Sequence, residues 1–279
     1  MLPAYLEYYK PTSLYEAVAL FQELKRANKQ PMYFSGGTEV LTLGRLNMDT
    51  PGSIIDIKGI PECITLERTT QFLTIGASVP LTVIEADDSF PLLANVSSEI
   101  ADRTARNKIT IGGNICGKIF YREAVLPFLI ADSHLLIASL QGVHQIPINV
   151  IFNKELVLEE GQLLVNIRTE SHFLNNPFIS QKIRKQWETG YPLITGAAMK
   201  VDGALRIAFS GICPFPFRSP AMEKEINNTT LSIESRIENA INHLPEPILD
   251  DIEGSREYRL FVLRNLLTDF LLEMEGYNG

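Results

Sequence analysis

Two glycine pairs constrain the fold of this chain more than any other feature of its sequence. The first lies in segment 35–39, SGGTE, directly after the apolar run 32–34, and the second in segment 110–114, TIGGN. Glycine adopts positive φ without steric cost and lets a ligand approach the main chain closely. Successive N–H groups in such turns can bind an anion. Two such turns could hold a diphosphate without a cationic side chain, so they indicate dinucleotide binding.

The residues alone leave a purely structural interpretation open. A glycine pair after a strand often forms only a tight turn, and neither pair fits the GxGxxG or the Walker GK[ST] pattern. No serine lies in a GxSxG nucleophile motif, and the carboxylate pairs at 87–88 and 250–251 are typical of solvated turns. We therefore predict no catalytic constellation on this chain.

Charge, length and hydropathy exclude several classes of protein. The chain carries a net charge of −8, and an acidic surface repels phosphate backbones, so we expect no nucleic-acid partner. No apolar run approaches the roughly 20 residues that span a bilayer, and residues 1–5 lack the features of a signal peptide. With 279 residues, 45% of them hydrophobic, we expect a cytoplasmic protein of two or three small domains.

The cysteines and histidines predict no metal centre. Cys63, Cys116 and Cys213 are too few and too far apart for a disulfide framework. An iron–sulfur cluster normally takes four cysteine ligands, so we expect none on this chain. The four histidines show no ligand spacing.

Periodicity predicts mixed α and β structure up to about residue 175. Ser13 and Glu16 have capping-box spacing at the start of an amphipathic helix. Short apolar runs predict strands, and two further segments are typical of helices. The predicted strands cover 32–34, 53–57, 72–77 and 135–140, and the further helices cover 97–106 and 125–131.

The sequence changes character around residues 175–177, Asn-Asn-Pro, where we place a domain boundary. Beyond it, Asp202-Gly203 stands between the runs 195–201 and 205–210, which predicts a β-hairpin. Two amphipathic helices follow, one ended by Pro245 and one through Phe270. The segment 176–279 is therefore predicted to be an antiparallel sheet packed by helices.

Six motifs, in order along nearly the whole chain, resemble those of the FAD-binding (medium) subunits of molybdenum hydroxylases, the xanthine dehydrogenase and carbon monoxide dehydrogenase family. Segments 34–40 (FSGGTEV) and 110–115 (TIGGNI) resemble A-G-G-T-[DE]-L and T-I-G-G-N-[LI]. The other four segments are 10–17 (KPTSLYEA), 75–77 (IGA), 209–218 (FSGICPFPFR) and 254–259 (GSREYR).

The resemblance implies an α+β fold in two domains. Residues 1–175 would form a two-part α/β FAD-binding domain of the vanillyl-alcohol-oxidase (PCMH) type, with parts at about 1–58 and 59–175. Residues 176–279 would form a small α+β C-terminal domain. It also implies two groups of FAD contacts. The first would wrap the pyrophosphate and ribityl chain, and the second would close on them: Ser35, Gly36, Gly37, Thr38, Glu39 and Val40; Thr110, Gly112, Gly113 and Asn114.

The resemblance implies roles near the cofactor for four further residues. Glu123 stands nine residues after Asn114, where the family usually has an aspartate that contacts FAD. Leu158 and Leu164 match apolar positions near the rings of the cofactor. Lys182 lies near a family lysine close to the flavin. No histidine stands where covalent linkage would need one, so the resemblance implies non-covalent FAD.

Two segments depart from the family pattern. After TIGGN the family usually has small residues, but this chain has the bulky Phe120, Tyr121 and Arg122. The family's Asp-x-Ala at the start of the C-terminal domain is replaced by Gly190-Tyr191-Pro192. These departures could reshape the FAD pocket, change access of the electron acceptor or weaken FAD binding.

The implied function is electron transfer. Electrons from a molybdopterin centre on a large partner subunit would pass through iron–sulfur clusters on a small one to this chain's FAD, and then to NAD+ or another acceptor. The hydroxylated substrate could be xanthine or another purine. Two alternatives remain open at this stage. They are a stand-alone FAD-dependent oxidoreductase of the same fold and a non-enzymatic assembly protein that has lost FAD.

Overall fold

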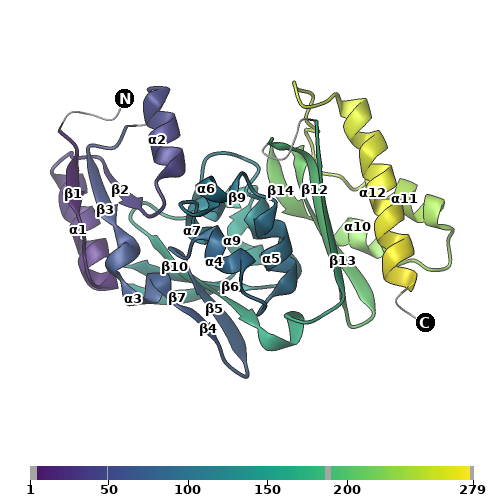
Figure 1. Cartoon of the computed structure of the whole chain (residues 1–279), viewed down its shortest axis with the longest axis horizontal. Coiled ribbons are helices and arrows are strands. Elements are labelled where there is room, and N and C mark those ends of the chain that lie inside the picture. Colours follow the sequence, from purple (N-terminus) through teal and green to yellow (C-terminus); the bar gives the residue numbers. More distant parts are fainter. Residues whose placement is uncertain (1–4, 49, 186–189, 277–279) are drawn as a thin grey trace.

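The N-terminal part is a three-stranded parallel sheet with one long helix. The computed structural model describes residues 5–48, 50–185 and 190–276 (Figure 1). Strand β3 (Ser53–Asp56) is central because all four of its residues are buried, and β1 (Glu7–Tyr9) and β2 (Pro31–Phe34) pair with its two edges. Helix α1 (Leu14–Arg26) packs the apolar face that its periodicity predicts.

Helix α1 begins at the predicted capping box. The Ser13 hydroxyl accepts a hydrogen bond from the Glu16 N–H at 3.2 Å, and the Glu16 carboxylate accepts one from the Thr12 N–H at 2.8 Å. We expect Ser13→Ala to lower the free energy of unfolding by about 1 kcal/mol, because one helix N–H loses its acceptor. Urea denaturation checks this, and an unchanged midpoint would show that Ser13 is dispensable.

Short helices follow the second and third strands of this sheet. Helix α2 (Thr38–Arg45) follows β2 directly and stands away from the body of the molecule in Figure 1. The one-turn helices η1 (Ile57–Gly59) and α3 (Pro61–Ile64) follow β3.

A five-stranded antiparallel sheet forms the middle of the molecule. Its strand order is β4-β5-β10-β6-β7, so the late strand β10 lies at the centre. The strands are β4 (Leu66–Arg68), β5 (Phe72–Gly76), β10 (Leu163–Glu170), β6 (His134–Ser139) and β7 (Gly142–Pro147). The remaining small elements of this part are α9 (Ile148–Ile151), the hairpin of β8 (Phe152–Asn153) and β9 (Glu155–Leu156), and η3 (Ser171–Phe173).

Short helices pack against this sheet, and one helix prediction is corrected. The helices are α4 (Leu81–Glu85), α5 (Pro91–Ser98), α6 (Arg103–Arg106), α7 (Ile111–Cys116), η2 (Glu123–Val125) and α8 (Leu126–Ile130). A continuous helix over 97–106 is wrong, because Ala101 adopts a positive φ of 50°. Asp102 then starts α6 as its N-cap, accepting from the Ala105 N–H at 2.7 Å.

The C-terminal part is a four-stranded antiparallel sheet covered by helices, as predicted. Its strands, in order, are β11 (Phe178–Arg184), β12 (Pro192–Val201), β13 (Ala204–Cys213) and β14 (Phe215–Arg218). Asp202 and Gly203 turn between β12 and β13 with φ of 50° and 81°, which confirms the predicted hairpin. Helices α10 (Pro220–Ile226), α11 (Ile233–Ile241) and α12 (Arg256–Gly276) follow, with α11 ending before Pro245.

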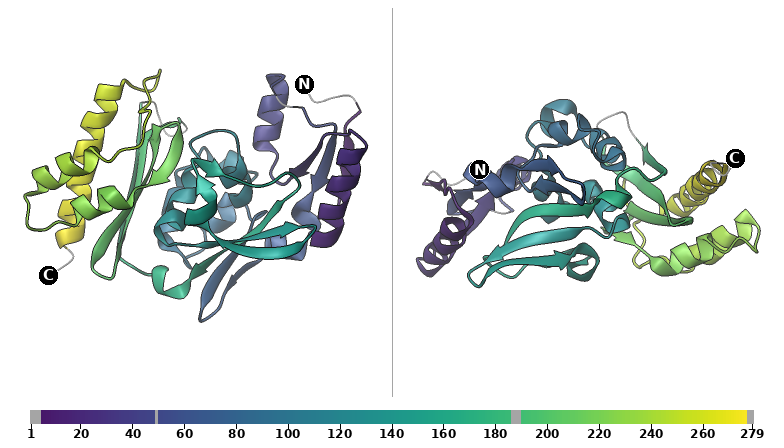
Figure 2. Two further views of the ribbon diagram at one scale, coloured as in Figure 1. Left: turned by 180° about the vertical axis from the view of Figure 1, so that it is seen from behind. Right: turned by 90° about the horizontal axis from the view of Figure 1, so that it is seen from below.

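The three parts follow one another along the long axis in chain order (Figure 2). One face of the C-terminal sheet packs on α12, and its other face joins the core of the middle part through Ala197, Met199 and Ala208. Among the described residues, no helix has the length and hydrophobicity needed to cross a bilayer.

Helix α8 is the element on which the C-terminal sheet rests. Arg206 donates to the Ile130 carbonyl at 2.9 Å and to Asp132 at 2.5 Å, while Arg218 donates to the Leu129 carbonyl at 3.0 Å and to Asp132 at 2.7 Å. These cations satisfy carbonyls at the helix C-terminus, where positive charge is stabilising. The opposite end of this helical segment, at Glu123, reaches the candidate site.

Candidate functional site

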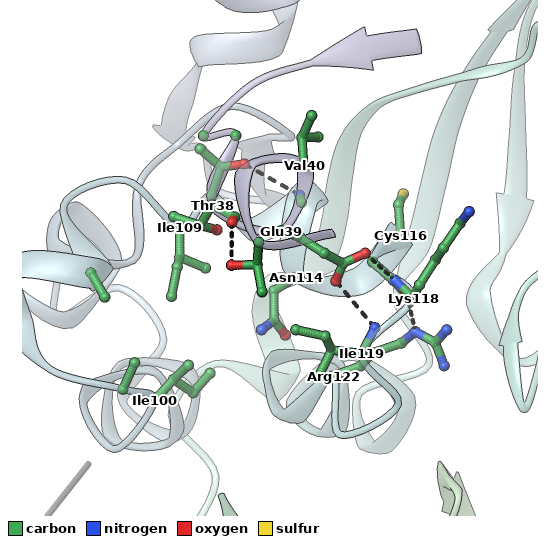
Figure 3. Close-up of a pocket in the computed structure, with 18 of the residues that line it drawn as sticks. Thr38, Glu39, Val40, Ile100, Ile109, Asn114, Cys116, Lys118, Ile119 and Arg122 are labelled. Carbon is green, nitrogen blue, oxygen red and sulfur yellow. Dashed lines mark hydrogen bonds between the residues drawn. The ribbon is translucent and has the colours of Figure 1, made fainter. Parts of the chain in front are cut away.

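A cavity of about 530 Å³ lies where the N-terminal part, the middle part and the start of the C-terminal sheet meet. Its walls come from β2, α2, α6, α7 and the segment 116–123, with Lys182 of β11 and Tyr191 at the C-terminal end. Figure 3 shows Glu39 of α2 in contact with Lys118 and Ile119, in the segment after α7, among the side chains that line it.

The two glycine turns are in direct contact. A Cβ added at Gly36 would lie 1.8 Å from the Lys108 carbonyl oxygen and 3.4 Å from the Thr110 nitrogen, so only glycine fits. Gly37 has a φ of 74°, and its Cβ would lie 2.4 Å from the Phe34 ring. The two turns therefore lie next to each other, close enough to reach one ligand.

The first turn supplies main-chain donors beside the cavity, whereas the N–H groups of residues 111–114 in the second turn already donate within the protein. Helix α2 begins at Gly37 without a side-chain cap, so its first N–H groups and the positive end of its dipole favour an anion. At the second turn the Thr110 hydroxyl accepts from the Gly113 N–H at 3.2 Å. A Cβ at Gly113 would meet only this hydroxyl within 4 Å, so the backbone there is open to a ligand.

Glu39 links helix α2 to the segment after α7. Its carboxylate accepts from the Lys118 N–H at 2.5 Å and from the Ile119 N–H at 3.1 Å (Figure 3). Asn114 stabilises the end of the segment 116–123, because its side-chain oxygen accepts a hydrogen bond from the Ala124 N–H at 3.1 Å. The wall of the cavity after α7 is therefore held by side chains that are distant in sequence.

A buried ion pair closes the C-terminal end of the cavity. The Lys182 ammonium lies 2.9 Å from the Glu123 carboxylate, and the two side chains are 2% and 6% exposed. Glu123 also accepts from the Thr195 hydroxyl at 2.6 Å, and Lys182 donates to the Glu99 carbonyl at 2.9 Å. Burial lowers the pKa of Lys182, and the charge of Glu123 opposes that shift.

Two of the bulky residues that depart from the family pattern, Tyr121 and Arg122, line the cavity. The Tyr121 ring stacks on the Tyr191 ring with centroids 4.7 Å apart and planes at 16°, and Phe120 packs against Tyr121. Arg122 adopts φ 37° and is 6% exposed, and its Nε donates to the Gly117 carbonyl at 2.6 Å. Burial raises the pKa of Tyr121 to about 12 and lowers that of the Arg122 guanidinium.

The cavity brings together most of the residues that the sequence singled out. Those that line it are Ser35, Gly36, Gly37, Thr38, Glu39, Val40, Thr110, Gly113, Asn114, Glu123 and Lys182. Gly112, Leu158 and Leu164 do not. Gly112 packs on Ala77, where a Cβ would come within 2.6 Å of the alanine Cβ. Leu164 is buried in strand β10, and Leu158 packs against the same core.

Sequence reasoning missed several lining residues. The sequence alone indicates no binding role for three residues that line the cavity, Lys118, Arg122 and Tyr191. The signal available for Arg122 and Tyr191 was their departure from the family pattern, which marked the positions without showing where the side chains point. None of the residues that line the described cavity is a histidine.

Comparison with known families decides the relationship. The family model described as the FAD binding domain in molybdopterin dehydrogenase matches residues 4–169, more than half of the chain. The chain belongs to this family. It is therefore an FAD-binding oxidoreductase chain, and the family relationship inferred from the glycine motifs is confirmed.

Relatives match the FAD-binding chain over most of its length. The carbon monoxide dehydrogenase medium chain of Hydrogenophaga pseudoflava is 25% identical, with 93% of each chain covered. The xanthine dehydrogenase FAD-binding subunit of Escherichia coli O157:H7 is 27% identical, covering 99% of this chain and 98% of the relative.

Solved structures confirm the predicted fold class. Carbon monoxide dehydrogenase from Hydrogenophaga pseudoflava matches with a TM-score of 0.86 at 24% identity, covering 97% of both chains. Quinoline 2-oxidoreductase from Pseudomonas putida 86 matches with a TM-score of 0.85 at 22% identity, covering 99% of both chains. At these identities the likeness shows the fold alone, and the boundaries near residues 58 and 175 stay predictions.

The cavity fits the family's cofactor. Bare backbone at Gly113 and the uncapped start of α2 offer the close approach and the N–H donors that a diphosphate needs. The stacked rings of Tyr121 and Tyr191 add an aromatic surface to the lining. FAD has a diphosphate between two aromatic ring systems, so both kinds of surface have a matching group on the cofactor.

Proposed function

We propose that this chain is the FAD-binding electron-transfer subunit of a molybdenum hydroxylase complex. The single observation that carries the proposal is the contact of the two glycine turns beside one cavity, in a chain whose family binds FAD. Electrons would arrive from iron–sulfur clusters on a small partner chain and leave to NAD+ or another acceptor. The molybdopterin centre would lie on a large partner chain.

Different residues of the cavity would bind different parts of FAD. The uncapped N-terminus of α2 and the backbone of Gly113 would hold the diphosphate. Tyr121 and Tyr191 would present their rings to the flavin, and the buried Glu123–Lys182 pair would fix a polar boundary beside it. The flavin supplies the chemistry, because it accepts electrons singly and releases them as a pair.

Two features support function inside a complex. Three cysteines are fewer than the four ligands of an iron–sulfur cluster, so the electron donor would belong to another chain. Leu41, Leu46 and Met48, on α2 and just beyond it, are 49%, 62% and 72% exposed. Neighbouring exposed apolar side chains of this size are typical of a surface that a partner covers.

The substrate class is proposed from the family alone. Relatives of almost equal similarity are named for carbon monoxide and for xanthine, and the substrate pocket would lie on the large chain. We propose a purine such as xanthine as the first substrate to test, with carbon monoxide and a heteroaromatic acid as the competing choices. NAD+ is the first acceptor to test.

Co-expression with its neighbouring genes tests the proposal. We expect a yellow complex that contains this chain, a molybdenum-bearing large chain and a cysteine-rich small chain, and denaturation should release free FAD because the binding is non-covalent. A yellow monomer that oxidises a small substrate unaided would instead indicate a stand-alone enzyme. A colourless chain that takes up no added FAD would indicate an assembly protein.

A further inference from the structure

Glu39 lines the cavity in which we place FAD under the proposed function, and FAD carries a negatively charged diphosphate. A carboxylate near a phosphate is repulsive unless donors compensate its charge. In this chain both Glu39 oxygens are already engaged by backbone donors, Oε1 by the Lys118 N–H and Oε2 by the Ile119 N–H. The carboxylate is therefore directed at the protein's own main chain.

Gly117 has no side chain, which leaves room for this carboxylate. An added Cβ at Gly117 would lie 2.6 Å from Glu39 Oε2 and 2.9 Å from the Gly113 carbonyl oxygen. Its φ of −62° is open to any residue, so glycine is required here by the close approach of two groups, the Glu39 carboxylate and the Gly113 carbonyl. Glu39 and Gly117 fit each other across 78 positions of sequence, which a surface contact formed by chance does not require.

Arg122 holds the same segment from its other side. Its Nε donates to the Gly117 carbonyl at 2.6 Å, and the guanidinium is almost fully buried. The segment 117–119 thus has its N–H groups bound by an anion and a carbonyl bound by a cation. Both groups line the cavity.

Helix α2 is only partly buried. It stands off the body of the molecule in Figure 1, its Leu41 is 49% exposed, and of its eight residues only Gly44 is buried. The bonds from Glu39 therefore hold α2, whose N-terminus faces the cavity, against the wall that follows α7. They add to the polar connection that Ser35 makes in the turn before α2, where its hydroxyl donates to the Ser78 hydroxyl at 2.9 Å.

We propose that Glu39 and Arg122 are positioning residues that clamp segment 117–119 between opposite charges, and so set the width of the FAD cavity. Glu39 acts on the cofactor through the backbone it holds. The inference rests on the proposed seating of FAD in this cavity. It assigns a structural task to Arg122, one of the bulky residues that depart from the family pattern.

Two substitutions break the clamp in different ways. Glu39→Gln leaves one acceptor but turns an NH2 group toward the second backbone N–H. Gly117→Ala keeps the Glu39 carboxylate but forces it to shift, because the new Cβ would lie 2.6 Å from Glu39 Oε2 and 2.9 Å from the Gly113 carbonyl oxygen. Glu16→Gln is the matched control, because Glu16 likewise accepts from a backbone N–H but lies at the start of α1, in the part of the chain that does not line the cavity.

Hydrogen exchange of the full chain, stripped of FAD, and FAD affinity measured by fluorescence titration are the two readouts. We expect both clamp variants to lose at least about tenfold of the exchange protection of segment 117–119 and to bind FAD about tenfold more weakly. Glu16→Gln should match the wild type in both. Unchanged protection of 117–119 in the two clamp variants would overturn the proposal, and so would tighter FAD binding by Glu39→Gln, which is expected if the carboxylate merely repels the diphosphate.

The exchange readout separates this inference from the proposed function. Protection of segment 117–119 is measured without FAD, so it reports the clamp alone. A wild-type chain that binds no FAD would contradict the proposed function while the exchange result still decided the clamp. Normal FAD binding with unchanged protection in both variants would contradict the clamp and leave the proposed function intact.

Discussion

Lys182→Met is expected to destabilise the chain by about 3–5 kcal/mol, because it leaves the Glu123 carboxylate buried without its cation. The two groups lie 2.9 Å apart and are almost completely buried. Their pairing also joins β11 of the C-terminal sheet to η2 at the cavity. We therefore expect the FAD affinity to fall at least about tenfold together with the stability. Urea denaturation and FAD titration measure the two effects.

A double variant and a surface control make this prediction specific. In Lys182→Met with Glu123→Gln no uncompensated charge remains, so most of the lost stability should return. Lys25→Met removes a cation from the exposed pair Lys25–Glu160, whose side chains are 45% and 63% exposed, and should cost less than about 1 kcal/mol. Equal losses from Lys182→Met and Lys25→Met would show that the buried pair has no special role.

Gly36→Ala is expected to abolish stable FAD binding. The new Cβ would lie 1.8 Å from the Lys108 carbonyl oxygen, and that atom belongs to the main chain and cannot rotate away. The two glycine turns must separate, which costs about 1–3 kcal/mol of stability as overpacking does. Because the turns would no longer share one ligand, we expect the FAD dissociation constant to rise at least about a hundredfold.

The FAD content of the purified variant, read from its visible absorbance, measures this effect. Gly276→Ala is the control, since a Cβ there meets nothing within 4 Å, and it should retain FAD as the wild type does. A Gly36→Ala protein that is as yellow as the wild type would contradict the account of two touching turns given above.

Local signals in the sequence were reliable where a few neighbouring residues decide the structure. Ser13 and Glu16 predicted the start of α1, and Asp202-Gly203 predicted the β12–β13 turn. The prediction of one helix over 97–106 was wrong. The composition of the segment suits a helix throughout, but Ala101 adopts a positive φ and Asp102 caps a new helix. Helical preference summed over the segment does not reveal such an interruption, because it gives no weight to the N-cap that Asp102 forms.

At the candidate site, too, predictions from contiguous residues were more reliable than predictions for isolated positions. Motif residues that are contiguous in sequence, such as those at 35–40, reach the cavity together because one turn carries them. Gly112 belongs to the second glycine motif but packs against Ala77 and not against the cavity, because successive residues of a helix point in different directions. Leu158 and Leu164, placed by likeness to relatives, pack into the core away from this cavity.

By itself the sequence determined the family, the glycine turns and the order of the principal helices and strands, because each of these depends on residues adjacent or nearly adjacent along the chain. Only the tertiary structure decided that Glu39 reaches the amides of 118 and 119, and that Lys182 and Thr195 enclose Glu123. These contacts join residues 59 to 80 positions apart. Their geometry follows from how three sheets pack, which no local pattern encodes.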